Sequence, residues 1–370
     1  MAESFIEKTC ERISDAAAAK TPLRIRAGGT KDFYGGDLMG DVLDVSAYSG
    51  IVAYEPKELV LTVKAGTPLA EIERVLEGER QMLAFEPPRF GTNSTIGGTV
   101  ASGFSGPRRP YAGAVRDFVL GTRIVNGKGE DLSFGGRVIK NVAGYDVSRL
   151  MAGALGTLGV LTEISFKVLP RPPMDVTLAF QMDEAAATRQ VNAWAGQPLP
   201  LSASAWLGGR LLVRLSGAPS AVAAARARIG GDEATDLPGF WEALRDHRIE
   251  FFNNPRSIWR LSVPQTAEPI PTPHPQLVEW GGGQRWVAGD LDALAIREAA
   301  ARVGGHATLF RNGDKSVGVF HPLQPALMKI HRRLKAAFDP AGILNDGRMF
   351  SFSALGPVSG QSREDKKHGE

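Results

Sequence analysis

Apolar residues in the first half of the chain follow the spacing of short helices and strands. Phe5, Ile6, Cys10 and Ile13 keep helical spacing, which predicts an amphipathic helix over residues 3–19. Cys10 lies on the apolar side of that helix, so we interpret it as a packing residue. Further along, the pattern predicts strands over 22–26, 41–46, 59–64 and 164–169, a helix over 69–78 and an Asn-Gly hairpin within 123–133.

The pattern changes after the proline-rich segment 170–173, which we interpret as a domain boundary. The order that follows is strand, helix, strand, strand, helix, and it predicts an antiparallel sheet with helices on one face. The polar residues at the C-terminus are typical of a disordered tail. The predicted elements are strands 176–181, 203–207, 211–216, 258–263, 286–289, 307–311 and 317–320 and helices 183–194, 219–229, 291–303 and 323–338.

Composition and charge narrow the class of protein. The 370 residues are 43% hydrophobic and 22% charged, which is ordinary for a soluble protein of two domains. The net charge of +3, without a long basic cluster interleaved with aromatic residues, disfavours nucleic-acid binding. Neither a signal-peptide pattern nor an apolar run long enough to span a bilayer is present. We therefore expect a cytoplasmic protein that meets the inner membrane only through partners.

Cysteine and histidine are too sparse for most metal chemistry. Cys10 is the only cysteine, which excludes an internal disulfide and any iron–sulfur cluster or cysteine-based zinc site built by this chain alone. The six histidines begin at His247, and none shows the close pairing that a transition-metal site on one helix needs. The sequence therefore predicts no metal site.

The densest glycine segment is Gly91–Gly113, in which six of twenty-three residues are glycine. Because glycine has no Cβ, a ligand can approach the backbone closely, and successive N–H groups can converge on a phosphate. Two shorter segments, 28–30 and 153–159, offer the same chemistry, with an ordinary β-turn and a close-packed helix–strand corner as their alternatives. The fingerprints G-x-G-x-x-G and G-x-x-x-x-G-K-[ST] are both absent, which excludes Rossmann and P-loop nucleotide sites.

Four segments of the chain carry a family resemblance. They read RIRAGGTKDFYGG, VLTVKAGTPLAEIERVL, GGTVASGFSGPRRPYAGAVRDFVLG and VIKNVAGYDVSRLMAGALGTLGVLTEISFKVLPRP. Together they resemble the PCMH-type FAD-binding domain of the vanillyl-alcohol oxidase superfamily, and within it the E-subunit family of bacterial glycolate oxidases. The resemblance covers residues 20–175, and KAAFDPAGILNDGRM near the C-terminus extends it more loosely.

The resemblance implies an α+β fold in four parts. A two-part PCMH-type FAD-binding domain is expected over residues 1–172, followed by an antiparallel-sheet cap domain with helices on one face over 173–322. A C-terminal helix and segment, 323–352, are expected to return to the FAD-binding domain. Residues 353–370 remain as the disordered tail.

The cofactor that the resemblance implies is FAD, whose two phosphates suit backbone N–H donors. Since no histidine precedes His247 and no cysteine follows Cys10, FAD is expected to bind without a covalent link, with a link through tyrosine as the alternative. The implied cofactor-binding residues are Arg26, Ala27, Gly28, Gly29, Thr30, Lys31, Pro87, Pro88, Gly91, Thr95, Ile96, Gly97, Gly98, Thr99, Ala101, Ser102, Gly103, Gly153, Gly156, Thr157, Gly159, Val160 and Asn345.

The resemblance also implies hydride transfer from the α-carbon of a small 2-hydroxy acid to the flavin. Such a site needs a base for the hydroxyl proton and cations for the carboxylate, which arginine binds well through its planar fork. The candidate catalytic residues are Arg260, His306 and Arg311, and Arg256 and Arg348 also lie in segments expected to cap the flavin. Arg260 is the first choice, because an arginine within a strand needs an anionic partner or solvent. A structural or surface role is the alternative for each.

Three functions are open on this basis. In the first, the chain is an active dehydrogenase subunit that oxidises glycolate or D-lactate at its own FAD. In the second it is a flavin-carrying accessory subunit, and in the third a stand-alone FAD-linked oxidase. The catalytic sister subunit of the family carries a histidine-rich metal segment without a counterpart here, which favours the accessory role in mechanism. The implied partners are a larger FAD-binding catalytic subunit and an iron–sulfur subunit.

Overall fold

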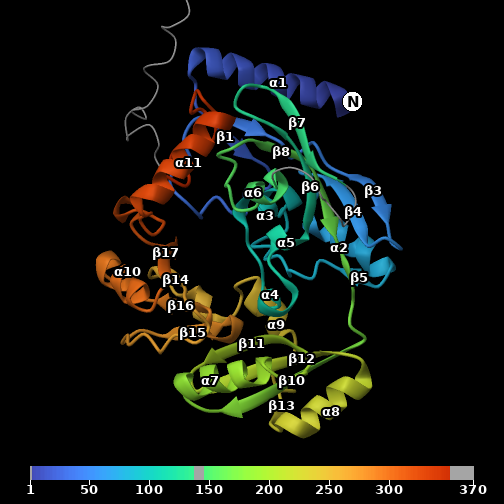
Figure 1. Ribbon diagram of the computed structural model, residues 1–370, viewed down its shortest axis with the longest axis vertical. Helices are drawn as coiled ribbons and strands as arrows, with labels where there is room; N and C mark the ends of the chain where they lie inside the picture. The colour runs from blue at the N-terminus through green and yellow to red at the C-terminus, as the bar shows by residue number, and fades with distance from the viewer. Residues whose placement is uncertain (1, 137–145, 351–370) are drawn as a thin grey trace, which may run out of the picture.

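The computed structural model describes residues 2–136 and 146–350, which form two lobes (Figure 1). The centre of the first lobe is a five-stranded antiparallel sheet in the order β3-β4-β8-β6-β7. Helices cover one face of this sheet and enclose a core that includes Leu61, Ile72 and Phe166. The elements of this lobe are α1 (Ala2–Ala19), β1 (Leu23–Arg26), β2 (Asp41–Asp44), β3 (Ile51–Glu55), β4 (Val60–Lys64), α2 (Leu69–Gly78), β5 (Gln81–Met82), α3 (Ile96–Ser102), α4 (Arg109–Ala112), α5 (Val115–Phe118), β6 (Val119–Val125), β7 (Asp131–Gly135), α6 (Val147–Met151), β8 (Val160–Lys167) and β9 (Leu169–Pro170).

A small parallel sheet lies beside the main one. Strands β1 and β2 pair in parallel, and apolar residues of α1 such as Ile6 and Ile13 pack against Leu23 and Leu43. Cys10 packs at the margin of the same cluster. The apolar face of α1 that the sequence predicted therefore packs on this sheet.

The second lobe is built on one eight-stranded antiparallel sheet in the order β13-β10-β12-β11-β15-β16-β14-β17. Helices α7, α8 and α10 bury one face of it. The opposite face, together with α9, packs against the first lobe. The elements are β10 (Met174–Gln181), α7 (Glu184–Ala195), β11 (Leu201–Leu207), β12 (Arg210–Gly217), α8 (Pro219–Ile229), β13 (Asp232–Glu233), α9 (Phe240–Arg245), η1 (Glu250–Asn253), β14 (Ile258–Ser262), β15 (Gln276–Glu279), η2 (Trp280–Gly282), β16 (Gln284–Ala288), α10 (Ala293–Arg302), β17 (His306–Arg311) and η3 (Lys315–Val317).

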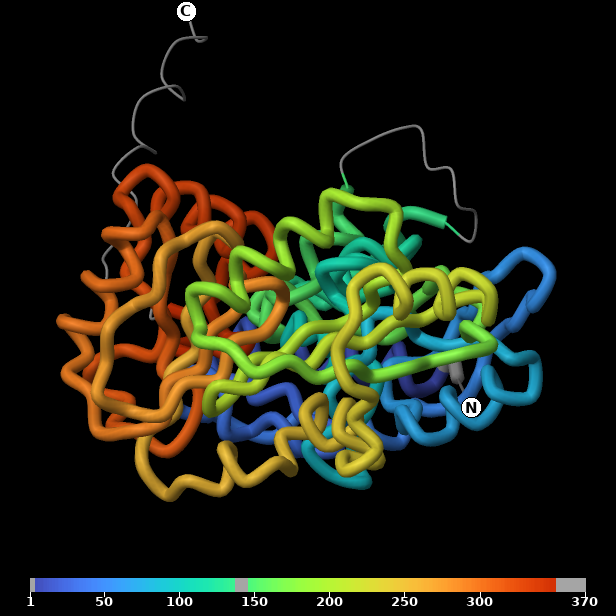
Figure 2. Tube along the Cα trace, turned by 90° about the horizontal axis from the view of Figure 1, so that it is seen from below, coloured from blue at the N-terminus to red at the C-terminus, as the bar shows by residue number. Residues whose placement is uncertain are grey.

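The C-terminal helix α11 (Pro325–Phe338) leads the chain back to the first lobe. Lys335 is buried, and its Nζ donates to Asp339 Oδ2 at 2.6 Å and to the Thr157 carbonyl at 2.9 Å. The residues after the helix then run along β1, where Leu23 N donates to Ile343 O at 2.7 Å. In both views α11, in red, lies on the same side of the molecule as α10, in orange (Figures 1 and 2).

The fold class expected from the sequence is confirmed, with local corrections. The predicted strand over 317–320 is wrong: a 3-10 turn ends at Val317, and Gly318 has a φ of +78°, which breaks extended structure. Segment 91–113 is not a continuous loop, since it contains α3 and α4. The helices of the second lobe are not confined to one sheet face as expected, since α9 packs on the face opposite to α7, α8 and α10. The predicted tail over 353–370 lies outside the described residues, as do residues 138–145, the first eight of the motif that begins VIKNVAG. None of the helices within 2–136 and 146–350 is long and apolar enough to cross a membrane.

Candidate cofactor site

A cleft of about 910 Å³, which includes solvent at its mouth, lies in the first lobe. Ligand pockets of proteins span about 300–1,000 Å³, so the cleft is large enough for a sizeable organic cofactor. Its walls come from the loop after β1, from α3, from the loop between α6 and β8 and from the C-terminal segment. All of these walls belong to the first lobe or to the returning chain.

The loop after β1 owes its path to glycine. A Cβ on Gly28 would overlap the backbone carbonyl of Asn93, and Gly29 has a φ of +70°. Both positions therefore disfavour larger side chains. The hydrogen bond of 2.8 Å from Arg26 Nε to Asp32 Oδ2 closes the turn. As a result, the loop presents its backbone to the cleft.

Helix α3 presents Gly98 to the same cleft. The Thr95 hydroxyl caps the helix by accepting from Gly98 N at 3.3 Å. A Cβ on Gly97 would lie 2.8 Å from Ala65, whereas a Cβ on Gly98 would meet only Thr95 Oγ1, at 3.4 Å. The space beside Gly98 is thus left open by the protein and belongs to the cleft.

Lys31 is a half-buried cation at the cleft. Its Nζ donates to Ser94 Oγ at 2.7 Å, and it makes no ion pair within the described chain. Burial lowers its pKa to about 8 from the 10.5 of an ordinary lysine. A buried ammonium group without a counterion is costly, and an anionic ligand in the cleft would remove that cost. Lys31 and the two glycine-built walls therefore fit a cofactor that carries phosphate.

Many of the sequence-predicted cofactor residues line this cleft, and the rest do not. Those that line it are Arg26, Ala27, Gly28, Gly29, Thr30, Lys31, Thr95, Gly97, Gly98, Ala101, Ser102, Gly156, Gly159 and Asn345. Those outside its lining are Pro87, Pro88, Gly91, Ile96, Thr99, Gly103, Gly153, Thr157 and Val160. Ile96 and Thr99 are fully buried on α3, with Ile96 in the core of the lobe, and Pro88 lines a smaller cavity between the lobes.

Sequence reasoning missed lining residues of two kinds. Ile25, Leu38, Val45, Ala65, Met151, Ala154, Leu155 and Leu161 are apolar or small, and Asp32 and Tyr34 are polar or charged. The apolar members carry no signal that distinguishes them from core residues. Asp32 and Tyr34 belong to the motif RIRAGGTKDFYGG, so reading that motif to its end would have found them, whereas Arg348, which also lines the cleft, was expected only among the arginines that cap the flavin.

Asn345 joins three walls of the cleft. Its side-chain Nδ2 donates to Leu155 O at 2.7 Å, and its Oδ1 accepts from Ile25 N at 2.8 Å. Its backbone N donates to Leu23 O at 3.0 Å. Both polar groups of the side chain are thus used within the protein, and they hold β1 and the loop before β8 against the C-terminal segment.

An aromatic cluster fills the contact between the lobes. It consists of Phe33, Tyr34, Phe90 and Phe104 from the first lobe around Phe310 of β17. The ring centroids lie 5.4, 5.5, 6.3 and 5.6 Å, respectively, from that of Phe310. Tyr34 belongs both to this cluster and to the lining of the cleft.

Two predicted catalytic arginines lie on this cluster. The Arg260 guanidinium lies 5.7 Å from the Phe104 ring and 5.9 Å from Phe310, and its Nη2 donates to the Tyr34 hydroxyl at 3.2 Å. Arg311 lies 4.6 Å from the Phe33 ring and also reaches Phe310, at 5.8 Å. Burial lowers the pKa of Arg311. Neither arginine makes an ion pair within 2–136 and 146–350, so the structure brings together two cations without a counterion.

His306, the third candidate, lies at the start of the edge strand β17. It pairs with Ser262 of β14, two residues along the ladder from the pair that Arg260 forms with Thr308. Its side chain is exposed, and its ring lies 6.4 Å from that of His321. Partial burial, with a smaller effect of Arg260, lowers its pKa. His306 therefore shares the sheet face of Arg260 but stands at its rim.

A smaller cavity of about 320 Å³ lies behind the aromatic cluster and holds residues that sequence reasoning missed. Glu279 accepts from Trp286 Nε1 at 2.6 Å and from Gln284 Nε2 at 3.1 Å, and burial raises its pKa to about 7. His247 stacks on Phe252 with 3.7 Å between ring centroids, and burial, aided by the two nearby arginines, lowers its pKa. No local sequence signal marks either residue, because their burial depends on the packing of the lobes.

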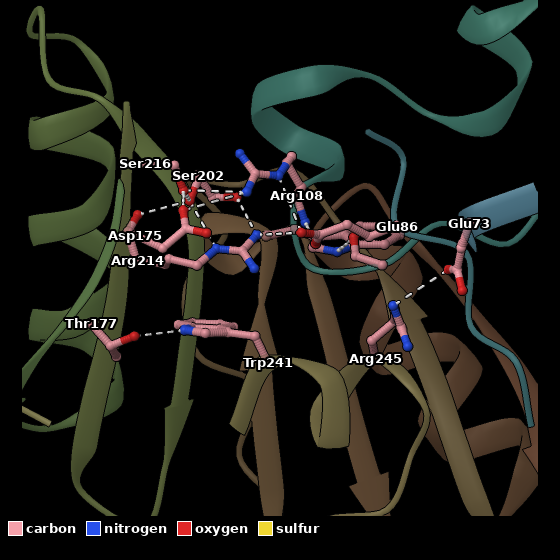
Figure 3. Close-up of polar contacts among 12 residues, drawn as sticks. Glu73, Glu86, Arg108, Asp175, Thr177, Ser202, Arg214, Ser216, Trp241 and Arg245 are labelled. Carbon is pink, nitrogen blue, oxygen red and sulfur yellow. Dashed lines mark hydrogen bonds and ion pairs between the residues drawn. The ribbon is translucent and has the colours of Figure 1, made fainter. Parts of the chain in front are cut away.

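A network of charged residues holds the lobes together beside this cavity (Figure 3). Glu86 of the first lobe binds Arg108 Nε at 3.1 Å and Arg214 Nη2 of β12 at 2.7 Å. Arg108 and Arg214 are both almost fully buried. At the other end of the network, Arg245 of α9 approaches Glu73 of α2 at 3.8 Å. The second lobe is thus fixed to the first by buried polar contacts as well as by aromatic rings.

Comparisons with known proteins agree with this geometry. A family model described as FAD binding domain matches residues 6–135. Glycolate oxidase subunit GlcE of Escherichia coli (strain K12) is 46% identical to the chain over 347 residues, which cover 94% of this chain and 98% of that protein. The chain belongs to the GlcE family of glycolate oxidase subunits.

Other relatives of this GlcE-family chain are more distant. Glycolate oxidase subunit GlcD of Bacillus subtilis (strain 168) is 31% identical over 186 residues, which are 49% of this chain and 39% of that protein. Among solved structures, p-cresol methylhydroxylase with substrate bound superposes with a TM-score of 0.66 at 14% identity, covering 93% of this chain and 87% of that one. That likeness shows the fold alone.

FAD is the cofactor of this GlcE-family chain. The residues fit it: two walls built by glycine leave backbone exposed, and Lys31 supplies a cation that lacks a counterion. No group of histidine, cysteine, aspartate or glutamate in the described part of the chain is arranged to hold a metal ion. The expectation of an FAD-dependent oxidoreductase subunit is confirmed by the family.

Proposed function

We propose that the chain is the FAD-binding subunit of a glycolate oxidase complex, in which it takes part in the oxidation of glycolate to glyoxylate. The observation that carries this proposal is the cleft of the first lobe, where bare backbone and the unpaired Lys31 suit an anionic dinucleotide. Kinship to subunit GlcE along almost the whole chain supports the substrate. FAD binds without a covalent link in this proposal.

The second lobe supplies the substrate side in this proposal. When bound, FAD supplies the acceptor for the hydride that leaves the α-carbon. Arg260 and Arg311 hold the carboxylate of the 2-hydroxy acid, because both guanidinium groups lie on the aromatic cluster without a counterion in the described chain. His306, at the rim of the same face, accepts the hydroxyl proton, and its lowered pKa keeps it neutral and able to do so.

The remaining expectations from the sequence belong to the same proposal. Residues 1–172 form the FAD-binding domain, 173–322 the cap, and 323–352 the returning segment. Electrons leave through a larger FAD-binding subunit and an iron–sulfur subunit, since Cys10 alone cannot build a cluster. The complex works in the cytoplasm, at the inner membrane through those partners.

A flavin-carrying accessory role is the second candidate, and the aromatic cluster favours it. Five rings occupy the sheet face where a substrate would lie, and the cavity behind them measures only about 320 Å³. In that case the two arginines stabilise negative charge that develops on the cofactor rather than a carboxylate.

Anaerobic titration of the purified chain with glycolate, followed by flavin absorbance, separates the two candidates. If the chain oxidises glycolate at its own FAD, the absorbance bleaches without partners, and Arg260→Gln or Arg311→Gln abolishes bleaching. Arg256→Gln is the matched control, since Arg256 is an exposed arginine that pairs with Asp290 at 3.6 Å. A spectrum that stays oxidised contradicts autonomous oxidation and supports the accessory role. A colourless chain that takes up no added FAD would overturn both.

A further inference from the structure

The loop of residues 31–36 is wrapped around the side chain of Arg348. Its Nη2 donates to Lys31 O at 2.9 Å, and its Nη1 donates to Asp32 O at 3.1 Å and to Gly36 O at 2.9 Å. In return, Gly36 N donates to Arg348 O at 2.8 Å. The loop after β1 and the C-terminal segment therefore hold each other in place at the wall of the cleft.

Arg348 combines deep burial with hydrogen bonds to carbonyl groups alone. It is 6% exposed, and it makes no ion pair among the residues that the structure describes. A guanidinium group is planar and carries five N–H donors in a fixed fork, so it reaches three diverging carbonyls that an ammonium group cannot match. Arg348 also lines the FAD cleft. The hydrogen bonds of the Arg348 side chain therefore fix the conformation of the loop of residues 31–36 at the cofactor site.

Tyr34 is the residue of this loop that reaches both the cleft and the second lobe. It lines the cleft, and its hydroxyl accepts from Arg260 Nη2 at 3.2 Å. Its backbone N donates at 3.1 Å to Lys31 O, the carbonyl that Arg348 also binds. A shift of the loop would therefore move the ring and the hydroxyl of Tyr34 together.

We propose that Arg348 is a positioning residue that sets the loop of residues 31–36, so that Tyr34 forms a wall of the FAD site on one side and orients Arg260 on the other. Arg348 thereby links the cofactor cleft to the cationic face of the second lobe. The last link, from Arg260 to a substrate carboxylate, rests on the proposed function. The first link, from Arg348 to FAD, does not.

Arg348→Lys tests the first link, because it keeps the charge and removes the fork. We expect the Kd of the apoprotein for FAD to rise at least about tenfold and the visible circular dichroism of the bound flavin to change. Arg285→Lys is the matched control. Arg285 is also buried and donates to the carbonyls of Gly282, Ala267 and Glu268, but it lies in the second lobe away from the cleft.

The control separates positioning from general stability. Both variants lose thermal stability, but only Arg348→Lys weakens FAD binding and alters the dichroism. The assignment is overturned if Arg348→Lys binds FAD within twofold of the wild-type Kd, or if Arg285→Lys weakens FAD binding as much. Should Arg348→Lys not fold, Gly36→Ala replaces it, since a Cβ there would overlap the carbonyl of Gly347. The same rise in Kd is expected for it, and a wild-type Kd would overturn the assignment.

A double-mutant cycle tests the role of Tyr34. If Arg348 acts through this ring, Tyr34→Leu and Arg348→Lys weaken FAD binding by no more together than the larger single change does. If the increases in the Kd for FAD of the two single variants multiply in the double variant, the link through Tyr34 is contradicted. These FAD titrations contain no glycolate, so their outcome does not depend on the proposed function. If glycolate fails to bleach the flavin of the wild-type chain, autonomous oxidation is refuted, but the assignment of Arg348 is unaffected.

Discussion

Gly98 offers a substitution with opposite effects on the apoprotein and on cofactor binding. In Gly98→Ala the new Cβ would meet only Thr95 Oγ1, at 3.4 Å, so the apoprotein loses no packing. Within a helix such as α3, alanine is about 1 kcal/mol more favourable than glycine. We therefore expect the apoprotein to gain up to about 1 kcal/mol in its free energy of unfolding.

The affinity for FAD changes in the other direction. The new Cβ occupies space at the wall of the cleft, where the backbone of α3 faces the cofactor. Overpacking of a close contact costs about 1–3 kcal/mol. That range corresponds to a rise in the Kd for FAD of about 5-fold to 150-fold. Gly98→Val adds two further methyl groups, so its Kd is expected at or beyond the upper end.

Titration of the apoprotein with FAD, followed by flavin fluorescence, gives the Kd, and urea unfolding gives the stability. Gly78→Ala is the control, because a Cβ on Gly78 at the end of α2 meets nothing within 4 Å and lies outside the cleft. It should gain helix stability without changing the Kd. A Gly98→Val protein that binds FAD with the wild-type Kd would refute the reasoning, since the cofactor would then not approach Gly98.

Two further outcomes follow from buried charges. The pKa of Lys31 is lowered to about 8, so its charge destabilises the apoprotein below that pH, and this cost fades as the pH rises toward 10.5. Because phosphate favours the charged amine, the affinity for FAD should fall as the pH rises through about 8. Lys31→Met should remove this pH dependence of the affinity. The same variant should stabilise the apoprotein at neutral pH. Glu86→Gln removes the carboxylate that the buried Arg108 and Arg214 share, leaving only Asp175 at 3.8 Å from Arg108, and should cost about 3–5 kcal/mol in urea unfolding. Its control, Glu77→Gln, removes an exposed pair with Arg171 and should cost less than about 1 kcal/mol, and equal losses would contradict the role of the network.

Local signals in the sequence predict most of the elements. The helix predicted over 69–78 is found as Leu69–Gly78, because a proline entry and apolar residues at helical spacing act within the segment itself. Helix α8 likewise spans the predicted 219–229. Helix α3 escaped prediction because two glycines lower its intrinsic propensity by about 1 kcal/mol each. Burial of Ile96 and Val100 and the cap from Thr95 outweigh that loss.

The parts of the site that escaped prediction depend on contacts between distant segments. The glycine backbone at the cleft is a local property and was predictable. The roles of Arg348 and Glu86 arise from partners more than a hundred residues away, at Lys31 and Arg214. Nothing within a short window of sequence records such a partner. An arginine that binds backbone carbonyls looks the same in the sequence as one that binds a carboxylate.

The position of the cleft makes the exchange of FAD independent of movement between the two lobes. Every residue that lines it belongs to the first lobe or to the returning C-terminal segment, and the second lobe contributes none. The second lobe is held in place by the buried network around Glu86 and by the aromatic cluster around Phe310. The binding and release of FAD therefore do not require these contacts to break, and Tyr34 joins the lining of the cleft to Arg260 across the interface. The loop that Arg348 holds therefore provides a direct route between the FAD cleft and Arg260.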